Sequence, residues 1–487
     1  MGNFDRRAFL KIAGVAGATG LARVPGAIPL AYAADEPTPS APSVIAGKSP
    51  QMIVHNAKLG VMETPLEFLR DQRFTPKEIL YNRLHFPVDG AGKWEATTAP
   101  MDPSVTQQWT ILVSGLVQRP KTIRVSDLEK MDQVKRTSVM QCAGNGRSYY
   151  WAKAKTPGSG WKHGGMGNLV WEGVPLMPLL KSLELSPDAR VRYLTANGKD
   201  VPPVPGGADL IKSYPLTAPQ LDDAILALRM NGEPIPTVHG GPVRLIIPGY
   251  YGNMNVKWLT DLLFMPDETP SALMQKTYRM PLRTVEPGKF TTQDLTQENS
   301  TPTYGFAVMS VVFAPLAGQT VQGGNVDLKG VAWNDGLVPL NSVRVSLDQG
   351  KSWMATDVDA SDGPYAWHHW QTRVRLPRGS HEVWVRAIDA WGRGQPLDGL
   401  TTWNPGGWDW PGVDRLVSGL CAGEVGAVLC FDASRPARNV RDWHHLLELC
   451  GLVEARVIDL DGVYNPCRPN DRLLLGMQST ISAFEPG

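Results

Sequence analysis

The stretch Ser138–Trp151 reads SVMQCAGNGRSYYW and contains Cys142, the single cysteine of the first 420 residues. A run of β-forming residues precedes the cysteine and a Gly/Asn turn follows it, so we expect the thiol at the end of a strand. Arg147 lies five residues further on. A thiolate beside cationic side chains is deprotonated and can bind a soft metal. The alternative for such a cysteine is a small buried hydrophobic residue.

The N-terminus, residues 1–34, has the pattern of an export signal. Arg6 and Arg7 are followed by a mildly apolar Ala/Gly-rich run and by an Ala-Tyr-Ala sequence that ends at Ala33. This pattern is typical of a twin-arginine signal peptide with its cleavage site. A short anchoring helix is the alternative, but the run is too short and too rich in glycine to span a bilayer comfortably. We therefore expect a periplasmic protein that is exported already folded.

Length and composition predict a soluble protein of several domains. A chain of 487 residues is too long for one ordinary core. Its net charge of +1 gives no electrostatic reason to propose nucleic acid or a membrane surface as a partner. No later segment is long and apolar enough to suggest a membrane span. Residues 35–50 are rich in Pro, Ser and Ala and are expected to form a disordered linker.

Residues 51–300 mix short strands and helices, which predicts an α+β domain. The expected strands are rich in β-branched residues and bounded by Gly or Pro, at residues 109–117, 191–196 and 242–249. Helical spacing of apolar residues predicts helices at 77–84 and 176–185.

Residues 301–408 have a different character and predict a β-sandwich. Residues 341–353 alternate apolar and polar side chains and turn at Asp348–Gly350. Residues 369–394 do the same around Pro377–Gly379. Strands at intervals of about ten residues with turns between them are typical of an immunoglobulin-like sandwich.

Several motifs occur together and in one order. They are QCAGNGRSYY (141–150), WEGVPL (171–176), MNGEPIPTVHGGPVRLIIPG (230–249) and NVKWL (255–259). Together they resemble the molybdopterin domain of the sulfite oxidase family. The SLDQGKSW motif (346–353) resembles that family's dimerisation domain. The resemblance covers residues from about 50 to about 408.

The resemblance implies a Mo-molybdopterin cofactor, a pyranopterin dithiolene whose molybdenum takes a third sulfur from Cys142. The implied activity is the oxidation of sulfite, a small anionic sulfur substrate, by oxygen-atom transfer. The chain has no haem-attachment motif, so electrons are expected to pass to a separate c-type cytochrome. The dimerisation domain implies a homodimer.

The resemblance also assigns roles to seven further side chains. Those expected to hold the substrate anion are Arg83, Arg147 and His368. Those expected to hold the pterin are His85, His239, Arg244 and Lys257. Guanidinium groups suit an anion with several oxygens because they donate two parallel hydrogen bonds.

Two positions depart from the family pattern. Leu228 stands where the family's active-site tyrosine is expected, and His368 stands where the family has a third substrate arginine. An altered anion pocket leaves other activities open: a sulfane dehydrogenase of a thiosulfate-oxidising complex, or a reductase on the same centre. A third possibility is an inactive fusion product without cofactor.

The tail, residues 413–487, resembles a truncated part of the α/β catalytic domain of serine recombinases. The ASRPAR motif places Arg435 and Arg438 where that family has its catalytic arginines. The strand that carries the family's nucleophilic serine is missing, and no DNA-binding domain follows. We therefore expect no DNA binding and interpret the tail as the product of a gene fusion. Its four cysteines lack zinc-finger spacing.

Overall fold

The computed structural model describes residues 45–86, 96–151, 154–202, 205–283, 285–322, 324–377, 379, 381–395, 406, 427–429, 447–448, 450, 455–458 and 463–482. The predicted export signal, the linker up to residue 44 and the predicted arginine motif of the tail (Arg435 and Arg438) lie outside these residues.

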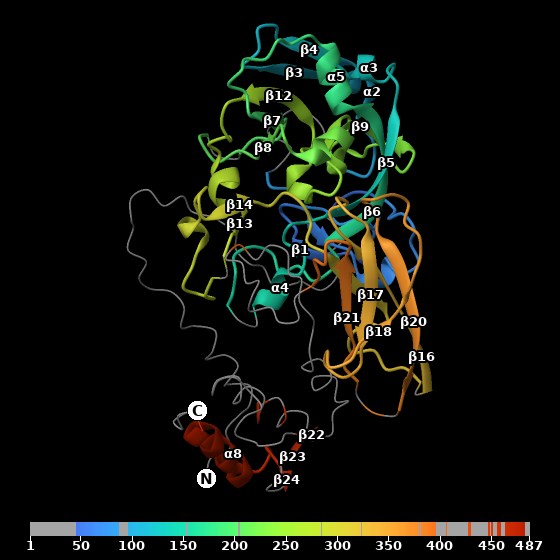
Figure 1. Cartoon of the computed structure of the whole chain (residues 1–487), viewed down its shortest axis with the longest axis vertical. Coiled ribbons are helices and arrows are strands. Elements are labelled where there is room, and N and C mark those ends of the chain that lie inside the picture. Colours follow the sequence, from blue (N-terminus) through green and yellow to red (C-terminus); the bar gives the residue numbers. More distant parts are fainter. Residues whose placement is uncertain are drawn as a thin grey trace. The chain divides into compact units, whose positions relative to one another are not determined.

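Two five-stranded sheets form the framework of the first domain (Figure 1). The first has the order β10-β9-β6-β5, with β11 pairing β9, and comprises β5 (Val134–Gln141), β6 (Met166–Pro175), β9 (Ile225–Met230), β10 (Glu233–Pro234) and β11 (Arg244–Ile246). The second has the order β4-β3-β12-β7-β8 and comprises β3 (Thr110–Gly115), β4 (Lys121–Arg124), β7 (Tyr193–Gly198), β8 (Lys212–Pro215) and β12 (Leu259–Met265). Only β3 and β12 pair in parallel among these strands, in the residues that the structure describes.

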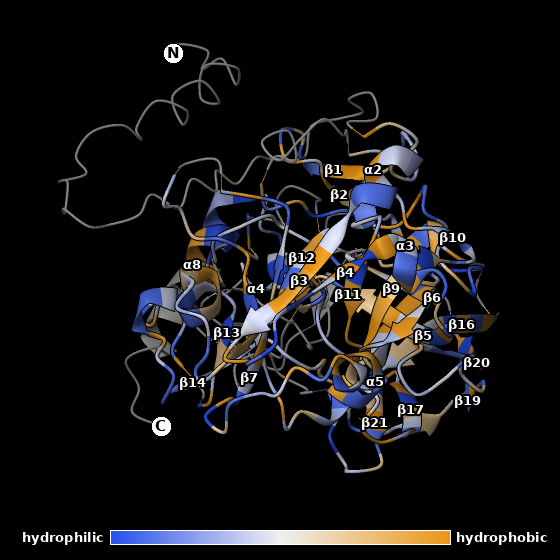
Figure 2. Cartoon of the chain, turned by 90° about the horizontal axis from the view of Figure 1, so that it is seen from above, coloured by the Kyte–Doolittle hydropathy of each residue, from blue (hydrophilic) through white to orange (hydrophobic). Residues whose placement is uncertain are grey.

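Short helices and two small sheets complete the domain. The helices are α2 (Pro103–Gln108), α3 (Val125–Leu128), α4 (Arg147–Tyr150) and α5 (Leu176–Ser182). The small sheets are β1 (Ile53–Asn56) with β2 (Val61–Glu63), and β13 (Arg279–Pro281) with β14 (Ser300–Pro302). The largest apolar cluster joins both five-stranded sheets and α5, and apolar residues are concentrated along β6 and β9 (Figure 2). Burial of these side chains is the main stabilising contribution.

One predicted helix is wrong. Residues 77–84 form a single turn, in which the amides of Ile79 and Leu80 both donate to the carbonyl of Pro76. The chain then extends, and Asn82 exchanges two backbone hydrogen bonds with Met62 of β2. Tertiary pairing has overridden helical spacing here. The extended path brings Arg83 and His85 to the cavity described below.

Two antiparallel sheets form the second domain. One has the order β15-β16-β20-β19 and comprises β15 (Met309–Ala314), β16 (Gly324–Trp333), β19 (Asp357–Val358) and β20 (His368–Leu376). The other has the order β18-β17-β21 and comprises β17 (Leu340–Ser346), β18 (Met354–Ala355) and β21 (Trp384–Asp389). One apolar cluster contains residues of both sheets, such as Trp370 of β20 and Val345 of β17, as in a β-sandwich.

The connection at Pro377–Gly379 differs from a simple hairpin. The strands on either side of it, β20 and β21, belong to different sheets. The turn at Asp348–Gly350 does join neighbouring strands, and Gln349 and Gly350 both have positive φ there. Alternation of side chains predicts strands but does not say which neighbour each strand pairs with.

The sandwich packs against the strand that leads to Cys142. Trp333 of β16 donates its indole N–H to Gln141 Oε1 at 3.0 Å. The amide of Val139 donates to the carbonyl of Tyr365 at 2.8 Å. One buried apolar cluster contains residues of both domains, including Val139 and Trp333. The end of β5 is therefore held from the sandwich side.

The described part of the tail is a small α/β unit. β22 (Ala427–Leu429) pairs in parallel with β23 (Arg456–Ile458), which pairs with β24 (Val463–Tyr464). The helix α8 (Pro469–Ser482) follows. Cys450 is buried and Cys467 is exposed.

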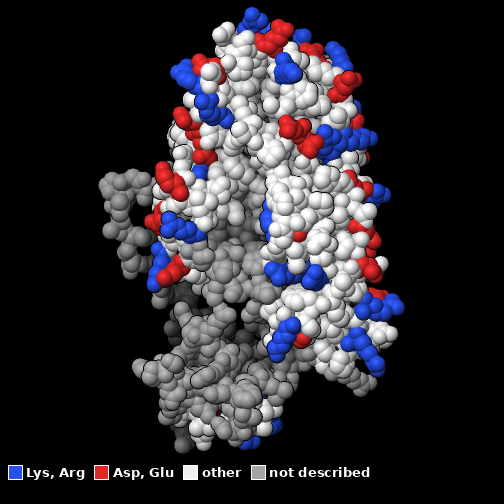
Figure 3. Space-filling view, in the orientation of Figure 1, with Lys and Arg blue, Asp and Glu red and all other residues white. Residues whose placement is uncertain are grey.

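Surface charge is mixed on the face shown in Figure 3, where positive and negative side chains are interspersed over the described residues. This distribution agrees with the near-zero net charge. Among the described residues, no helix combines the length and apolar character needed to cross a bilayer.

Candidate functional site

Cys142 lies one residue after the end of β5, as the sequence predicts. Its amide donates to the carbonyl of Gly165 at 2.7 Å, and the amide of Gly144 lies 3.4 Å from its Sγ. The side chain is partly buried, and it lines an open cavity. The thiol therefore faces the cavity from a loop whose backbone is hydrogen-bonded to Gly165.

The cavity contains about 740 Å³ of space free of protein atoms, including its open mouth. Six of the eight predicted site residues line it, and they come from separate parts of the chain: Arg83, His85, Cys142, His239, Arg244 and Lys257. Asp200 is the single carboxylate among the described residues of the wall. Burial, assisted by Asp209, raises the pKa of Asp200 to about 6. The wall therefore carries an excess of positive charge.

Carbonyl oxygens, not carboxylates, accept the hydrogen bonds of Arg244 and Lys257 described here. Arg244 donates to the carbonyls of Asn255 at 3.0 and 3.1 Å and of His239 at 3.0 Å. Lys257 donates to the carbonyl of Val238 at 2.8 Å. Burial lowers the pKa of Arg244 to about 10, and burial together with Arg244 lowers the pKa of Lys257 well below its usual value. A bound anion would supply the negative charge that this wall lacks.

His85 contacts a tyrosine that the sequence analysis did not single out. Its Nε2 forms a short hydrogen bond with the hydroxyl of Tyr278, which also lines the cavity. Burial, followed by the nearby side chains of Arg83, Lys212 and Lys257, lowers the pKa of His85 well below its usual value, which favours the neutral ring. The ammonium of Lys212 lies 4.4 Å from the centre of the Tyr278 ring.

Leu228, the position where the family resemblance leads us to expect a tyrosine, lies away from the cavity wall, whereas another tyrosine lines it. Leu228 is buried in the main apolar cluster, whereas Tyr278 supplies a phenol in the cavity wall. Tyr278 follows η6 (Leu273–Thr277), a π-helical turn, and such turns are frequent at functional sites. A lone tyrosine far from the motifs carries no sequence signal of this kind.

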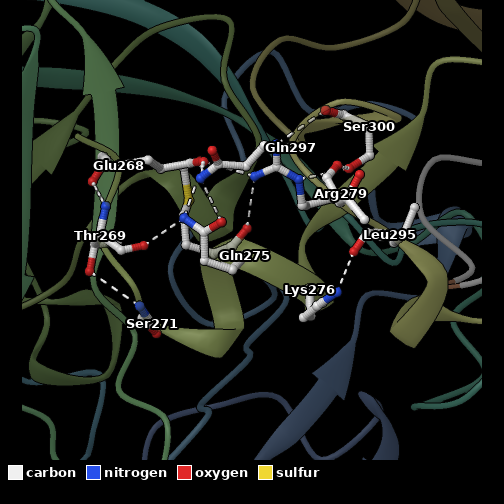
Figure 4. A network of polar contacts seen from close by, with 12 residues as sticks. Glu268, Thr269, Ser271, Gln275, Lys276, Arg279, Leu295, Gln297 and Ser300 are labelled. Atoms are coloured by element: carbon white, nitrogen blue, oxygen red, sulfur yellow. Dashed lines mark hydrogen bonds and ion pairs between the residues drawn. The ribbon is translucent and has the colours of Figure 1, made fainter.

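A polar network around Arg279, the residue after Tyr278, fixes this segment (Figure 4). Arg279 and Glu268 form a buried ion pair at 2.9 Å. Arg279 also donates to the hydroxyl of Ser300 at 2.8 Å, and Gln275 donates to the carbonyl of Thr269 at 2.8 Å. The buried charges of Arg279 and Glu268 are therefore paired, which stabilises a single backbone conformation.

Arg147 and His368 are not among the residues that line the cavity. Arg147 is buried beside it, and its guanidinium donates to the carbonyls of Ser159 at 3.0 Å and Gly406 at 3.3 Å. Its charge still acts on the Cys142 thiol. His368 lies on β20, where its Nδ1 is 3.0 Å from the carbonyl of Asp359. Its predicted role at the anion stays a prediction.

Two glycines make room for Arg147. A Cβ added at Gly144 would lie 2.8 Å from Nη2 of Arg147, and one added at Gly158 would lie 2.5 Å from Nη1. Gly158 also has a φ of +98°. These contacts explain physically why small residues surround the arginine in this part of the sequence.

Lys48 lies within the predicted linker but belongs to the folded domain. The side chains of Ile45 and Lys48 are buried. The Lys48 ammonium donates to the carbonyls of Lys77 at 2.5 Å and Leu80 at 2.6 Å, and it lies 2.8 Å from Nε2 of His239. The prediction of a disordered linker is therefore wrong for residues 45–50, which belong to the folded domain. Composition alone misses them because two buried side chains anchor an otherwise linker-like segment.

The state of the Cys142 thiol differs from the prediction. Burial raises its pKa, and this effect exceeds the opposing effects of Arg147, the Gly144 amide and Arg83. The cations alone therefore do not deprotonate it. A metal ion bound to sulfur would do so directly.

The residues present fit a molybdopterin cofactor by their chemistry. Cys142 offers a soft sulfur ligand, and the cationic wall offers partners for a phosphate. Asn253, another wall residue, has a buried Oδ1 without a hydrogen-bond partner among the described residues. Such an acceptor suits an N–H group of a bound pterin.

Comparison with known proteins gives three domain matches. The oxidoreductase molybdopterin binding domain matches residues 97–273, and the Mo-co oxidoreductase dimerisation domain matches residues 300–408. The resolvase N-terminal domain matches residues 406–486.

Relatives of known identity cover the same region. The mitochondrial sulfite oxidase of Drosophila melanogaster is 29% identical over 362 residues, which is 70% of this chain and 58% of the fly protein. That of Homo sapiens is 28% identical over 367 residues, covering 73% and 64% of the two chains. This chain therefore spans less than two thirds of the length of either animal relative. The crystal structure of the sulfane dehydrogenase SoxCD from Paracoccus pantotrophus has a TM-score of 0.58 and 25% identity, over 72% of this chain and 82% of that chain.

These matches point to one class of protein: residues 97–273 match a molybdopterin-binding oxidoreductase domain and residues 300–408 match the dimerisation domain of molybdenum-cofactor oxidoreductases. They also confirm the chain's resemblance to the sulfite oxidase family, and the resolvase match confirms the second resemblance, that of the tail.

Proposed function

We propose that the protein is a periplasmic molybdenum oxidoreductase that oxidises sulfite or a closely related sulfur compound. The observation that carries this proposal is the cavity in which the Cys142 thiol faces an excess of buried positive charge. A soft ligand beside an anion-binding wall suits a metal that exchanges oxygen with a small sulfur anion.

The side chains divide into two groups in the proposed reaction. Cys142 would ligate molybdenum, and His85, His239, Arg244 and Lys257 would hold the pterin and its phosphate. When bound, the cofactor supplies the oxygen atom that passes to sulfur and takes up the electrons. Sulfite and one water molecule become sulfate, two protons and two electrons.

The substrate anion would be oriented by the remaining cations. Arg83 lines the cavity, and Arg147 lies against the loop of Cys142. When Nε2 of His85 carries the ring hydrogen and donates it to the Tyr278 oxygen, the Tyr278 hydroxyl is left as a further hydrogen-bond donor to an oxyanion. Arginine can pair with both sulfite and sulfate, so the same side chains can bind the substrate and the product.

Location and partners form part of the same proposal. The twin-arginine pattern supports export to the periplasm, where a c-type cytochrome would accept the electrons. The dimerisation-domain match supports a homodimer. The tail lacks the segment that carries a recombinase nucleophile, so we propose no DNA cleavage for it.

The test is an assay of the full chain purified from the periplasm. We expect about one molybdenum per chain and reduction of cytochrome c by sulfite. Molybdenum without sulfite oxidation would exclude our first choice of substrate. A chain exported without molybdenum would instead favour an inactive fusion product.

A second candidate is a sulfane dehydrogenase, and the structural likeness to SoxCD favours it. Steady-state assays with thiosulfate and with protein-bound sulfane, beside sulfite, separate the two activities. A sulfoxide assay with reduced viologen tests the reductase alternative. A rate that is highest with sulfane would replace the first proposal.

Substitution of Gly158 by alanine tests the role of Arg147. The added Cβ displaces the guanidinium, and we expect kcat/KM for sulfite to fall roughly 10²-fold, the scale of an ~1 Å misplacement. Gly318→Ala is the matched control, because Gly318 also has positive φ but has no heavy atom within 4 Å of the added Cβ. Equal kinetics for the two variants would contradict a role for Arg147 at the anion.

A further inference from the structure

Glu63, at the end of β2, is buried and has no role in the site as described so far. Its Oε1 accepts a hydrogen bond from the amide of Gly164 at 2.8 Å. Its Oε2 accepts from the amide of Lys162 at 3.1 Å and lies 2.6 Å from Nε2 of His55. Two backbone N–H groups and one histidine ring nitrogen thus converge on the two oxygens, so the carboxyl group is held in one orientation.

The segment held by Glu63 is the one that holds the loop of Cys142. The carbonyl of Gly165 accepts from the Cys142 amide at 2.7 Å, and the carbonyl of Lys162 accepts from the Gly146 amide at 2.6 Å. The amide of Gly165 donates to the side chain of Asn145 at 2.9 Å. One carboxylate therefore fixes residues 162–165, and these fix both ends of the turn that carries the thiol.

His55 completes this arrangement from the other side. Its ring packs against Trp161 with 5.1 Å between ring centres, and the carbonyl of Trp161 accepts from the Ser148 amide at 3.0 Å. Both His55 and Trp161 are buried. The position of the carboxylate is thus set by packing, and its charge also acts on the Cys142 thiol.

We propose that Glu63 is a positioning residue for Cys142, which orients the sulfur toward molybdenum and increases its electron donation through a buried negative charge. This inference rests on the proposed function, since it assumes that Cys142 ligates the metal. Groups that orient metal ligands without touching the metal commonly change activity 10- to 100-fold. No sequence motif predicts this role, because the two backbone amides that the glutamate binds lie about 100 residues away in the sequence.

The test compares Glu63→Gln with Glu233→Gln in the metal-loaded protein. Glutamine removes the charge, and its NH₂ group opposes one of the N–H donors. We expect the paramagnetic resonance spectrum of the partly reduced molybdenum centre to change and its reduction potential to become more positive. We also expect faster hydrogen exchange in residues 160–166 and a kcat lower by roughly 10- to 100-fold. Glu233 is exposed and pairs with Lys77, so its variant should match the wild type.

The outcomes are distinguishable. A wild-type protein without molybdenum would contradict the proposed function. A loaded Glu63→Gln protein with unchanged spectrum, potential and kcat would overturn this inference alone. If Glu63→Gln fails to fold, Glu63→Asp keeps the charge on a shorter side chain. A normal spectrum and kcat in that variant, despite the longer contacts, would equally overturn it.

Discussion

Cys142→Ser is expected to keep the pterin bound and to lose turnover. Loss of a residue that contacts a metal ligand without touching the metal lowers activity about 10- to 100-fold. Loss of the ligand itself should therefore lower kcat by more than ~100-fold. The pterin should remain because His239, Arg244 and Lys257 are untouched, line the same cavity and would hold it independently of the thiol. The measurements are steady-state oxidation of sulfite, molybdenum content, and pterin content after release from the protein.

Cys467→Ser is the matched control for this prediction. Cys467 is exposed in the tail, so its replacement should leave both cofactor content and rate unchanged. Full activity of Cys142→Ser would remove the thiol from the mechanism. X-ray absorption spectra of both variants report directly whether a sulfur atom has left the metal.

Arg279→Met is expected to give the largest loss of stability. Arg279 and Glu268 are both nearly inaccessible to solvent, with side-chain exposures of 3% and 6%. Removing one partner of a buried ion pair leaves the other charge unpaired, at a cost of about 3–5 kcal/mol. We expect the urea midpoint and the calorimetric melting temperature to fall accordingly. Since Tyr278 is the adjacent residue, the variant should also retain less pterin.

An exposed ion pair provides the control for this effect. Arg373 and Asp327 form an exposed pair on neighbouring strands of the sandwich. Because solvent screens such pairs, Arg373→Met should leave the melting temperature nearly unchanged. Equal losses for the two arginine variants would mean that burial of the Arg279 pair does not determine its contribution.

The sequence predicted those parts of the site that lie in motifs. Cys142 was expected at a strand end, and β5 does end at Gln141. The residues of the 230–259 segment come together in the structure because β9 and β11 pair and the loop after β11 returns to the cavity. The positions of these residues follow from spacing within the motifs and from short connections between neighbouring strands, both of which can be read from the sequence.

The parts that were missed depend on long-range contacts. Glu63 and Tyr278 are single residues whose roles come from partners about 100 and 190 residues away, at Gly164 and His85. The helix predicted at residues 77–84 was lost to pairing with β2. Likewise, the thiol pKa depends on burial, which a list of neighbouring charges cannot provide.

The contacts of Lys48 have a consequence for where the N-terminus can be cleaved. Lys48 joins the turn that ends at Leu80 to His239 in the cavity wall, and it lies 15 residues after Ala33 (48 − 33), the end of the predicted leader. A protease that cleaves just after the predicted signal peptide leaves the contacts of Lys48 intact. One that cuts 15 or more residues later (48 − 33) removes Lys48 and its contacts with Leu80 and His239. We therefore expect the length of the mature N-terminus to affect how well the protein retains a cofactor in this cavity.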